Sequence, residues 1–397
     1  MSSRRKHSKS RHGCSQCKAA HVKVWKPYVT TTIPQLIKQQ CDVVQPTCGK
    51  CMKTGKSCQF QNLVHARFSN TTSASYGQGY LTNPPLLVTP PQDGTATASE
   101  NGLLDELELM HHFSTVTYET MANRNDLRRM WQIQVPKMAL KQKYLMHSLF
   151  SITALHMGHS HPESQSLYID RAIRYYNLSL QEFTLKLQDI TQENSTSLFT
   201  CATLTVIFAF SLPVLRPHGE ATSPIEELIG IFTLLRGMPL VLGEMWNWVK
   251  ESEIAPLFVG RELDDTIVLS DDVNNAIKLL EDRNQLMSKS DSDRHIYTLA
   301  IQGLKECFKL ISSKERNNGM VFNWPISVSQ EYIAFLRSRR QMALVILAHY
   351  AVILNEIRDT WWVMGWGSKL IQELDQVVED EWKSLLVWPM EIIVKGR

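Results

Sequence analysis

The sequence predicts an all-α chain in which a small cysteine-rich N-terminal module precedes a large helical body. Six of the eight cysteines lie between residues 14 and 58. From about residue 101 to the C-terminus, apolar residues recur at three- and four-residue spacing, the pattern of amphipathic helices. No stretch alternates apolar and polar residues over a length that predicts a strand. With 397 residues, 43% of them hydrophobic, the chain can bury a large core.

The helical body is predicted from a series of segments with this spacing. They are "LLDELELMHHF" (103–113), "LMHSLFSITALHM" (145–157), "LYIDRAIRYYNLSLQEFTLKL" (167–187), "IEELIGIFTLLRGMPLVL" (225–242), "YIAFLRSRRQMALVILAHYAVILNEI" (332–357) and "KLIQELDQVVEDEW" (369–382). Another segment, "LSDDVNNAIKLL" (269–280), has the serine and acids favoured at a helix start. The most apolar run, residues 198–215, is short for a bilayer span and ends around Pro213. We predict that it is a buried core helix and that the chain has no stable membrane span.

Composition divides the chain into three regions. Residues 1–60 are too few to build an apolar core without a metal or disulfide staple. Residues 61–100 are rich in Ser, Thr, Gly and Pro and poor in charge, which indicates a flexible linker. Residues 101–397 are predicted to form one helical domain. No heptad run follows the cysteines, so the sequence leaves dimerisation open.

The first 60 residues are basic, although the whole chain has a formal net charge of only +3. Asp42 is the one acid among them, and their cations are Arg4, Arg5, Lys6, Lys9, Arg11, Lys18, Lys23, Lys26, Lys38, Lys50, Lys53 and Lys56. A basic module on a nearly neutral body is typical of nucleic-acid binding, with a disordered basic tail as the alternative. No secretory signal is visible, which favours a reducing compartment where clustered cysteines bind metal more often than they pair.

The six cysteines of the module follow a regular spacing with one interruption. They are Cys14, Cys17, Cys41, Cys48, Cys51 and Cys58. Twenty-three residues separate Cys17 from Cys41, where the rest of the pattern predicts about six. Without residues 24–40, the spacing becomes C-x2-C-x6-C-x6-C-x2-C-x6-C. Two tetrahedral zinc ions need eight ligand positions, and six thiolates supply them if two thiolates bridge both metals.

This spacing resembles the fungal Zn2Cys6 binuclear cluster of transcription factors, and the resemblance covers every cysteine of the module. It implies two Zn²⁺ ions per chain, with Cys14 and Cys48 as the bridging ligands. It also implies that the module binds double-stranded DNA at CGG triplets, with Lys18, His21 and Lys23 facing the major groove. A disulfide framework and a structural zinc module that contacts protein are the alternatives.

Residues 24–40, "VWKPYVTTTIPQLIKQQ", interrupt the module, and we hypothesise that they are a retained intron. Their removal restores the spacing and leaves the reading frame intact. Every valine codon begins with GT, so Val24 supplies a splice-donor dinucleotide, and Gln40 can be encoded by CAG, which supplies an acceptor. As translated, Val24 stands where a thiolate belongs. Cys41 then has to close the first half of the cluster over a long loop.

The helical body carries a second resemblance. "LMHSLFSITALHMGH", "LLRGMPLVL", "FNWPISVSQEYIAFLRSRRQMALVILAHYAVIL" and "TWWVMGWGSKLIQELDQVVEDEW" are similar to the regulatory domain of fungal sterol uptake control proteins, from about residue 105 onward. The resemblance implies a nuclear protein whose helical domain contacts the transcription machinery. It also implies that the domain can bind a small lipid or sterol, which gates nuclear entry or activation.

Aromatic side chains near the C-terminus are candidates for an apolar ligand pocket, with packing in an ordinary core as the alternative. They are Tyr350, Trp361, Trp362, Trp366 and Trp382. His349 lies on an apolar helix face, where we expect a satisfied core histidine. Cys201 and Cys307 are isolated in helical stretches, and we expect both to be buried core residues.

Two clusters have enzyme-like compositions. "HMGHSH" holds His156, His159 and His161, but no carboxylate lies at helical spacing and the next residue is proline, so we expect a helix end with capping or solvent exposure. The acidic pairs 264–265 and 271–272 do not extend to D-D-x-x-D. The sequence therefore predicts a sequence-specific, zinc-dependent regulator of RNA polymerase II transcription and no enzyme. The alternative is a helical ligand- or protein-binding regulator whose cluster is disabled by the insertion.

Overall fold

The computed structural model describes residues 98–216, 223–261, 266–286 and 291–395. These residues form helices and connecting turns with no strand among them, which confirms the all-α prediction for this part of the chain. The six cysteines of the predicted cluster, together with Lys18, His21 and Lys23, lie outside the described residues. The boundaries at residues 60 and 100 stay predictions.

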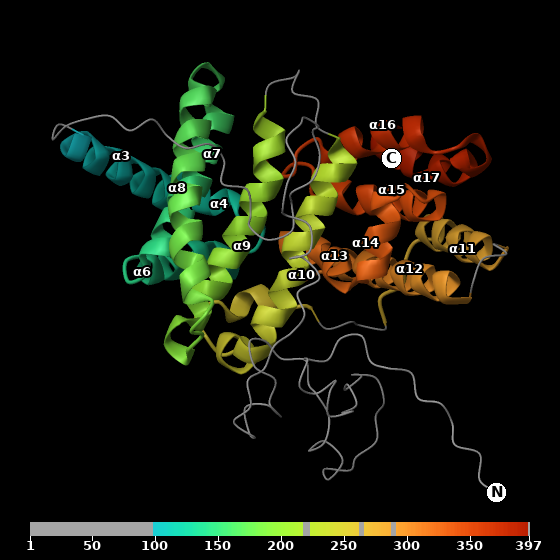
Figure 1. The fold of residues 1–397 in the computed structure, drawn as a ribbon, viewed down its shortest axis with the longest axis horizontal. Helices are drawn as coiled ribbons and strands as arrows, with labels where there is room; N and C mark the ends of the chain where they lie inside the picture. Colours follow the sequence, from blue (N-terminus) through green and yellow to red (C-terminus); the bar gives the residue numbers. More distant parts are fainter. Residues whose placement is uncertain (1–97, 217–222, 262–265, 287–290, 396–397) are drawn as a thin grey trace, which may run out of the picture. The chain divides into compact units, whose positions relative to one another are not determined.

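The described helices form two successive sets (Figure 1). The N-terminal half, residues 98–216, contains α3 (Ala98–His112), η2 (Phe113–Thr117), α4 (Tyr118–Thr120), α5 (Asn125–Arg129), η3 (Met130–Gln134), α6 (Val135–Ala139), α7 (Lys143–Ser160), η4 (Pro162–Ser164), α8 (Gln165–Lys186) and α9 (Gln192–Leu215). The C-terminal half, residues 223–395, contains α10 (Pro224–Val249), η5 (Ala255–Phe258), α11 (Asp271–Leu286), α12 (Asp291–Ser312), η6 (Asn318–Phe322), α13 (Asn323–Ser327), α14 (Gln330–Arg337), α15 (Gln341–Asn355), α16 (Trp366–Val377), η7 (Asp380–Leu386) and α17 (Val387–Lys395).

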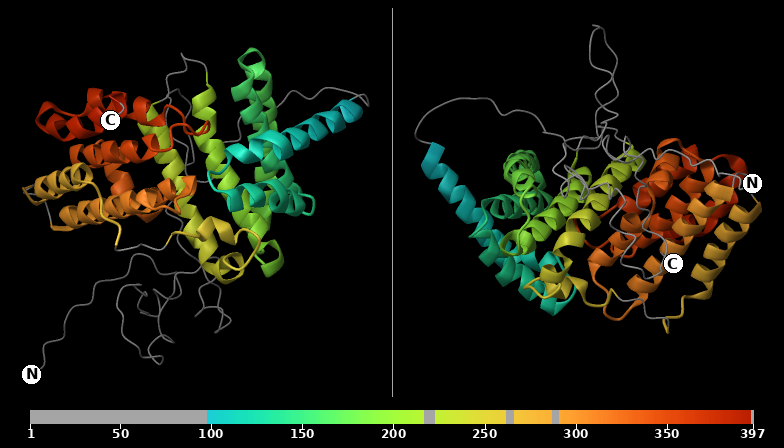
Figure 2. Two further views of the ribbon diagram at one scale, coloured as in Figure 1. Left: turned by 180° about the vertical axis from the view of Figure 1, so that it is seen from behind. Right: turned by 60° about the horizontal axis from the view of Figure 1, so that its bottom comes forward.

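Helices α7 and α8 pack side by side in the N-terminal half, joined by a short connection (Figures 1 and 2). Helix α7 ends at Ser160, where the amide of His161 donates to the Met157 carbonyl at 2.9 Å. Pro162 follows and has no amide hydrogen to continue the helix. The predicted helix end is therefore confirmed, and its cause is the proline.

Helix α9 contains the most apolar run of the chain. Its N-terminus is closed by a capping box, in which the Asn194 amide donates to Thr191 Oγ1 at 3.3 Å and the Thr191 amide donates to Asn194 Oδ1 at 2.8 Å. Among the described helices it alone is long and apolar enough to cross a membrane, and 72% of its apolar window is buried inside the fold. The prediction of a core helix is confirmed, although the helix continues past Pro213 to Leu215.

Helix α15 lies at the centre of the C-terminal half, and every residue from Met342 to Asn355 is buried. His349 is 2% exposed, its Nδ1 lies 2.8 Å from the Val345 carbonyl, and its ring stacks on Trp388. This confirms the expectation of a satisfied core histidine. Cys201 and Cys307 are also confirmed as buried, free core residues.

An aromatic cluster around Phe210 joins the two halves. Phe210 of α9 packs against Phe322, Trp362 and Trp366 of the C-terminal half, with ring centroids 5.2, 6.2 and 5.4 Å away. Trp366 Nε1 also donates to the Phe210 carbonyl at 2.9 Å. Because these contacts are buried, they hold α9 against the C-terminal half and fix the surfaces that meet beside them.

Helix α11 begins where the sequence predicted a helix start. Asp271 and Asp272 lie in its first turn, where carboxylates interact favourably with the helix dipole. The Val273 amide donates to Ser270 Oγ at 3.5 Å. The acidic pair 271–272 therefore belongs to a capped helix terminus, and the pair 264–265 lies outside the described residues.

Candidate functional site

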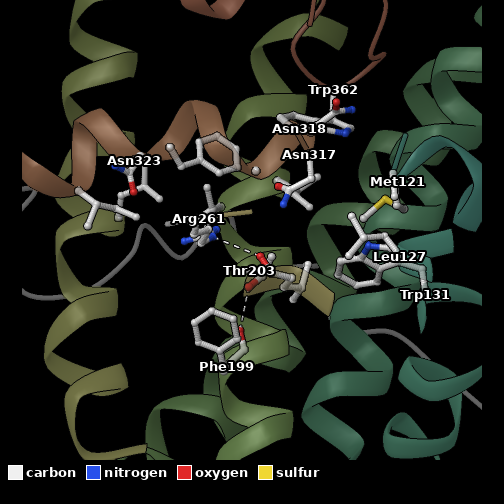
Figure 3. Close-up of a pocket in the computed structure, with 18 residues that line it drawn as sticks. Met121, Leu127, Trp131, Phe199, Thr203, Arg261, Asn317, Asn318, Asn323 and Trp362 are labelled. Atoms are coloured by element: carbon white, nitrogen blue, oxygen red, sulfur yellow. Dashed lines mark hydrogen bonds between the residues drawn. The ribbon is translucent and has the colours of Figure 1, made fainter. Parts of the chain in front are cut away.

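A cavity of about 270 Å³ lies where the N-terminal and C-terminal halves meet (Figure 3). Stretches that are far apart in the sequence enclose it. The lining residues are Met121, Ala122, Leu127, Trp131, Phe199, Thr203, Val206, Ile207, Leu235, Leu257, Arg261, Asn317, Asn318, Gly319, Phe322, Asn323, Ile326 and Trp362. Most of them are apolar, so the cavity suits a ligand with an apolar body.

One face of α9 forms part of the wall. Phe199, Thr203, Val206 and Ile207 recur at helical spacing, which places them on the same side of the helix. Thr203 Oγ1 donates to the Phe199 carbonyl at 3.0 Å, so this hydroxyl is satisfied within α9 (Figure 3). The α9 side chains that line the cavity therefore include no polar group without a hydrogen-bond partner.

Arg261 is the one charged residue among the described lining residues. Its Nε donates to the Leu257 carbonyl at 3.2 Å, and its Cζ lies 5.7 Å from the centre of the Phe258 ring. No carboxylate among the described residues forms an ion pair with it. Partial burial lowers the pKa of Arg261 below its ordinary value, because the charged guanidinium loses part of its contact with water. The cavity thus contains a partly buried positive charge.

The turn before Arg261 depends on Gly260. Its φ is 76°, a left-handed conformation that glycine adopts without a steric penalty. A Cβ at this position would lie 3.1 Å from the Glu315 carbonyl oxygen and 3.1 Å from Met320 Cε. The chain at Gly260 therefore lies directly against the segment that leads to the Asn317 side of the cavity.

Arg124 links the N-terminal half to the chain segments just before Gly260 and Asn317. Its Nη1 donates to the Val259 carbonyl at 3.3 Å and to the Glu315 carbonyl at 3.0 Å, and its guanidinium also pairs with Asp126. One side chain of the N-terminal half thereby binds two segments of the C-terminal half. The bond to Arg124 is the main reason that the pKa of Asp126 lies below its ordinary value.

Two more lining side chains carry buried donors without a partner. Asn317 is 5% exposed, and its Nδ2 has no acceptor among the described residues; the buried Nε1 of Trp362 has none among them either. A Cβ built on Gly319 would lie 3.1 Å from Asn317 Oδ1 and 3.7 Å from Arg261 Nη2, so both side chains flank this glycine. Figure 3 shows the Asn317 amide turned toward Arg261. Buried polar groups are normally hydrogen-bonded, so these two donors leave a position for an acceptor such as a water molecule or a ligand atom.

A second, more open hollow of about 520 Å³ adjoins the cavity and contains His156 and His159. His156 is 5% exposed, its Nδ1 lies 3.0 Å from Thr117 Oγ1, and its ring centroid lies 5.1 Å from that of Trp361. Burial lowers the pKa of His156 to about 4, so the ring is neutral at pH 7. The expectation of capping or solvent exposure is therefore wrong for His156, because the ring is packed against Trp361.

His161 does cap α7 as expected, since its Nδ1 lies 3.0 Å from the Met157 carbonyl. Across the described ranges, no three His, Cys, Asp or Glu side chains are grouped so that they could hold a metal ion. The histidines of "HMGHSH" thus pack and cap within the described fold.

Of the five aromatic residues that the sequence offered as candidates for a pocket, Trp362 lines the cavity and Trp361 lines the neighbouring hollow. Trp366, Tyr350 and Trp382 are buried in the core: Tyr350 donates from its hydroxyl to the Val321 carbonyl at 3.1 Å, and Trp382 donates from Nε1 to Glu381 at 2.7 Å. The sequence did not single out Arg261 or Asn317. The local signal in the sequence was Gly260, directly before Arg261, because glycine is typical of a turn.

Comparison with known proteins relates the N-terminal half to one family. Residues 108–216 match the family described as "Fungal specific transcription factor domain". The chain is similar to a Zn(2)-C6 fungal-type transcription factor of Gibberella zeae, with 26% identity over 454 aligned positions that cover 99% of this chain and 87% of the relative. It is also similar to the Zn(2)-C6 fungal-type transcription factor afumD of Aspergillus fumigatus, with 29% identity over 191 positions that cover 46% of this chain and 43% of the relative.

These matches support a class of protein, the transcription factors. More narrowly, the names of both relatives support the Zn(2)-C6 fungal type. The family match ends where α9 ends, so the cavity combines residues from the matched region with residues that follow it.

Proposed function

We propose that this protein is a nuclear, zinc-dependent, sequence-specific regulator of RNA polymerase II transcription. The observation that carries the proposal is the six-cysteine spacing in residues 14–58, followed by a helical body that matches a fungal transcription factor domain at residues 108–216. The similarity to a Zn(2)-C6 fungal-type transcription factor along 99% of the chain supports the same conclusion.

The N-terminal module is proposed to bind two Zn²⁺ ions through its six thiolates and to read CGG triplets. Lys18, His21 and Lys23 are the proposed contacts in the major groove. The basic charge of the first 60 residues supplies attraction to the phosphates. The helical body is proposed to contact the transcription machinery and to bind a small apolar ligand, for which the cavity between its halves offers the space.

Residues 24–40 are proposed to be a retained intron. A cluster with this insertion has Val24 at the position of the third thiolate, and Cys41 must reach back over a long loop. The insertion therefore favours the second candidate function, in which the helical body acts as a ligand- or protein-binding regulator that no longer binds DNA by itself. Sequencing the transcript tests this directly, since residues 24–40 in the abundant mature message would show that the segment is not an intron.

A DNA-binding assay tests the leading function. The chain without residues 24–40 should bind a CGG-containing duplex, and a zinc chelator should abolish binding. Lys18→Gln should weaken binding and reduce its salt dependence, because one fewer cation faces the DNA. Lys141→Gln, on an exposed lysine of the helical body, is the control and should leave binding unchanged. Equal binding of CGG-containing and unrelated duplexes would contradict sequence-specific recognition.

A further inference from the structure

We propose that the cavity binds a small amphipathic acid, whose carboxylate lies between Arg261 and Asn317 and whose apolar body lies against Trp131 and Phe199. This proposal rests on the proposed function, because it names the class of ligand that the helical body would sense. It also departs from the sterol that the sequence resemblance implies.

The donors around the cavity favour a carboxylate. Two lining side chains carry buried N–H groups without an acceptor among the described residues, Nδ2 of Asn317 and Nε1 of Trp362. The Nη groups of the partly exposed Arg261 form no hydrogen bond with these residues either. Arg261 uses only its Nε within the fold, on the Leu257 carbonyl. A carboxylate has two acceptor oxygens and can bind both a guanidinium and an amide N–H. A ligand hydroxyl has one oxygen and would accept fewer of these hydrogen bonds than a carboxylate.

The charge of the cavity favours an anion over a neutral ligand. Arg261 is the single ionised group among the described lining residues; it is partly buried, and no carboxylate of the described residues pairs with it. Partial burial of an unpaired charge is unfavourable, and an opposite charge at hydrogen-bond distance removes much of that penalty. The binding of an acid would thus neutralise a charge that the described fold leaves unpaired.

The size of the cavity limits the apolar body. A protein cavity of about 150 Å³ accommodates benzene, so about 270 Å³ accommodates about 11 non-hydrogen atoms. A sterol would have to extend beyond this space, because its fused rings alone contain more atoms than that. An aryl-substituted or medium-chain carboxylic acid does fit.

The position of the cavity connects ligand binding with regulation. Phe199 and Trp131 belong to the N-terminal half, whereas Arg261 and Asn317 belong to the C-terminal half. A ligand that contacts both halves stabilises the arrangement in which they meet. Ligand binding should therefore raise the thermal unfolding midpoint of the protein.

Calorimetric titration of the full chain with 3-phenylpropanoate tests the proposal, with 3-phenylpropanamide as the matched neutral probe. Both compounds have the same number of non-hydrogen atoms and differ in charge at one end. We expect saturable binding of the acid, at least tenfold tighter than binding of the amide. Equal affinities, or no saturable binding of the acid, would overturn the proposal. This comparison needs no variant and is independent of any folding defect.

Variants then locate the site. Arg261→Gln should weaken binding of the acid about tenfold to a hundredfold and leave the amide unchanged, since charge-assisted hydrogen bonds are lost. Arg316→Gln is the matched control, because Arg316 carries the same charge nearby but pairs with Glu356 at 3.8 Å and does not line the cavity. An unchanged affinity in Arg261→Gln, or an equal loss in Arg316→Gln, would overturn the assignment. Saturable ergosterol binding that the acid fails to displace would also overturn it.

These outcomes separate the ligand from the proposed function. A chain that binds the acid but, without residues 24–40, binds no CGG duplex contradicts the proposed DNA-binding function and supports the cavity proposal. A chain that binds the duplex but not the acid overturns the cavity proposal alone.

Discussion

Replacing Gly260 with alanine tests whether the turn before Arg261 holds the cavity in shape. Gly260 has a φ of 76°, which costs a residue with a side chain about 1–2 kcal/mol. The new Cβ would lie 3.1 Å from Glu315 Cβ, from the Glu315 carbonyl oxygen and from Met320 Cε. Met320 can move its terminal methyl, but Arg124 holds the Glu315 carbonyl, so overpacking adds about 1–3 kcal/mol. We expect Gly260→Ala to lower the free energy of unfolding by about 2–5 kcal/mol.

Gly230→Ala is the matched control for this prediction. Gly230 lies exposed within α10, and no atom lies within 4 Å of the position that its Cβ would take. Alanine at an open helical position stabilises the protein by about 0.5–1 kcal/mol, so the two variants should change stability in opposite directions. Urea denaturation followed by far-ultraviolet circular dichroism measures both. Gly260→Ala with the stability of the unchanged protein would refute the reasoning, because it would mean that the turn is loosely held.

Three further predictions concern the core. Burial lowers the pKa values of His156 and His349 from 6.5 to about 4, so between these pH values the unfolded chain binds more protons than the folded chain. The stability that their neutral forms provide is fully present above pH 6.5 and is lost as the pH falls. The expected loss is about 2 kcal/mol per histidine between pH 7 and pH 5. Urea denaturation across this range measures the loss, and a free energy of unfolding that does not change with pH would contradict the prediction. Trp366→Phe removes the bond from Nε1 to an α9 carbonyl and should lower the unfolding free energy by about 1–3 kcal/mol, whereas an unchanged thermal midpoint would argue against a role in joining the two halves. Leu344→Ala, at a fully buried position of α15, should lower the unfolding free energy by about 2–5 kcal/mol. The control Leu279→Ala, at a position that is 53% exposed, should change it by about 0.5 kcal/mol or less. Similar denaturation midpoints for the two variants would contradict the assignment of α15 to the core.

The helices could be predicted from the sequence because their signals are local. Proline after the last histidine of "HMGHSH" predicted the end of α7, and the acidic pair 271–272 predicted the start of α11. The apolar run at residues 198–215 predicted a core helix, since its length and composition are properties of one segment. The first turns of α9, from Gln192 to Ser197, were not predicted, because these residues are polar and do not belong to the apolar run.

The cavity could not be predicted because it forms only when distant segments meet. Arg261 follows a short turn, and its sequence neighbours give no indication that Asn317 and Trp131 will lie around the same space. The tryptophans near the C-terminus were a partial signal. Periodicity cannot decide which of them faces a cavity and which, like Trp366, packs in the core, because both environments are apolar.

The most direct test of the proposed function is the zinc content of two chains, the full chain and the chain without residues 24–40. Elemental analysis of both, with binding of a CGG-containing duplex measured in parallel, compares the interrupted module with the restored one. We predict two zinc ions per chain and binding of the duplex when residues 24–40 are absent, and one zinc ion or none when they are present. If neither chain binds zinc, the six cysteines do not form the proposed cluster, and the proposed function is wrong.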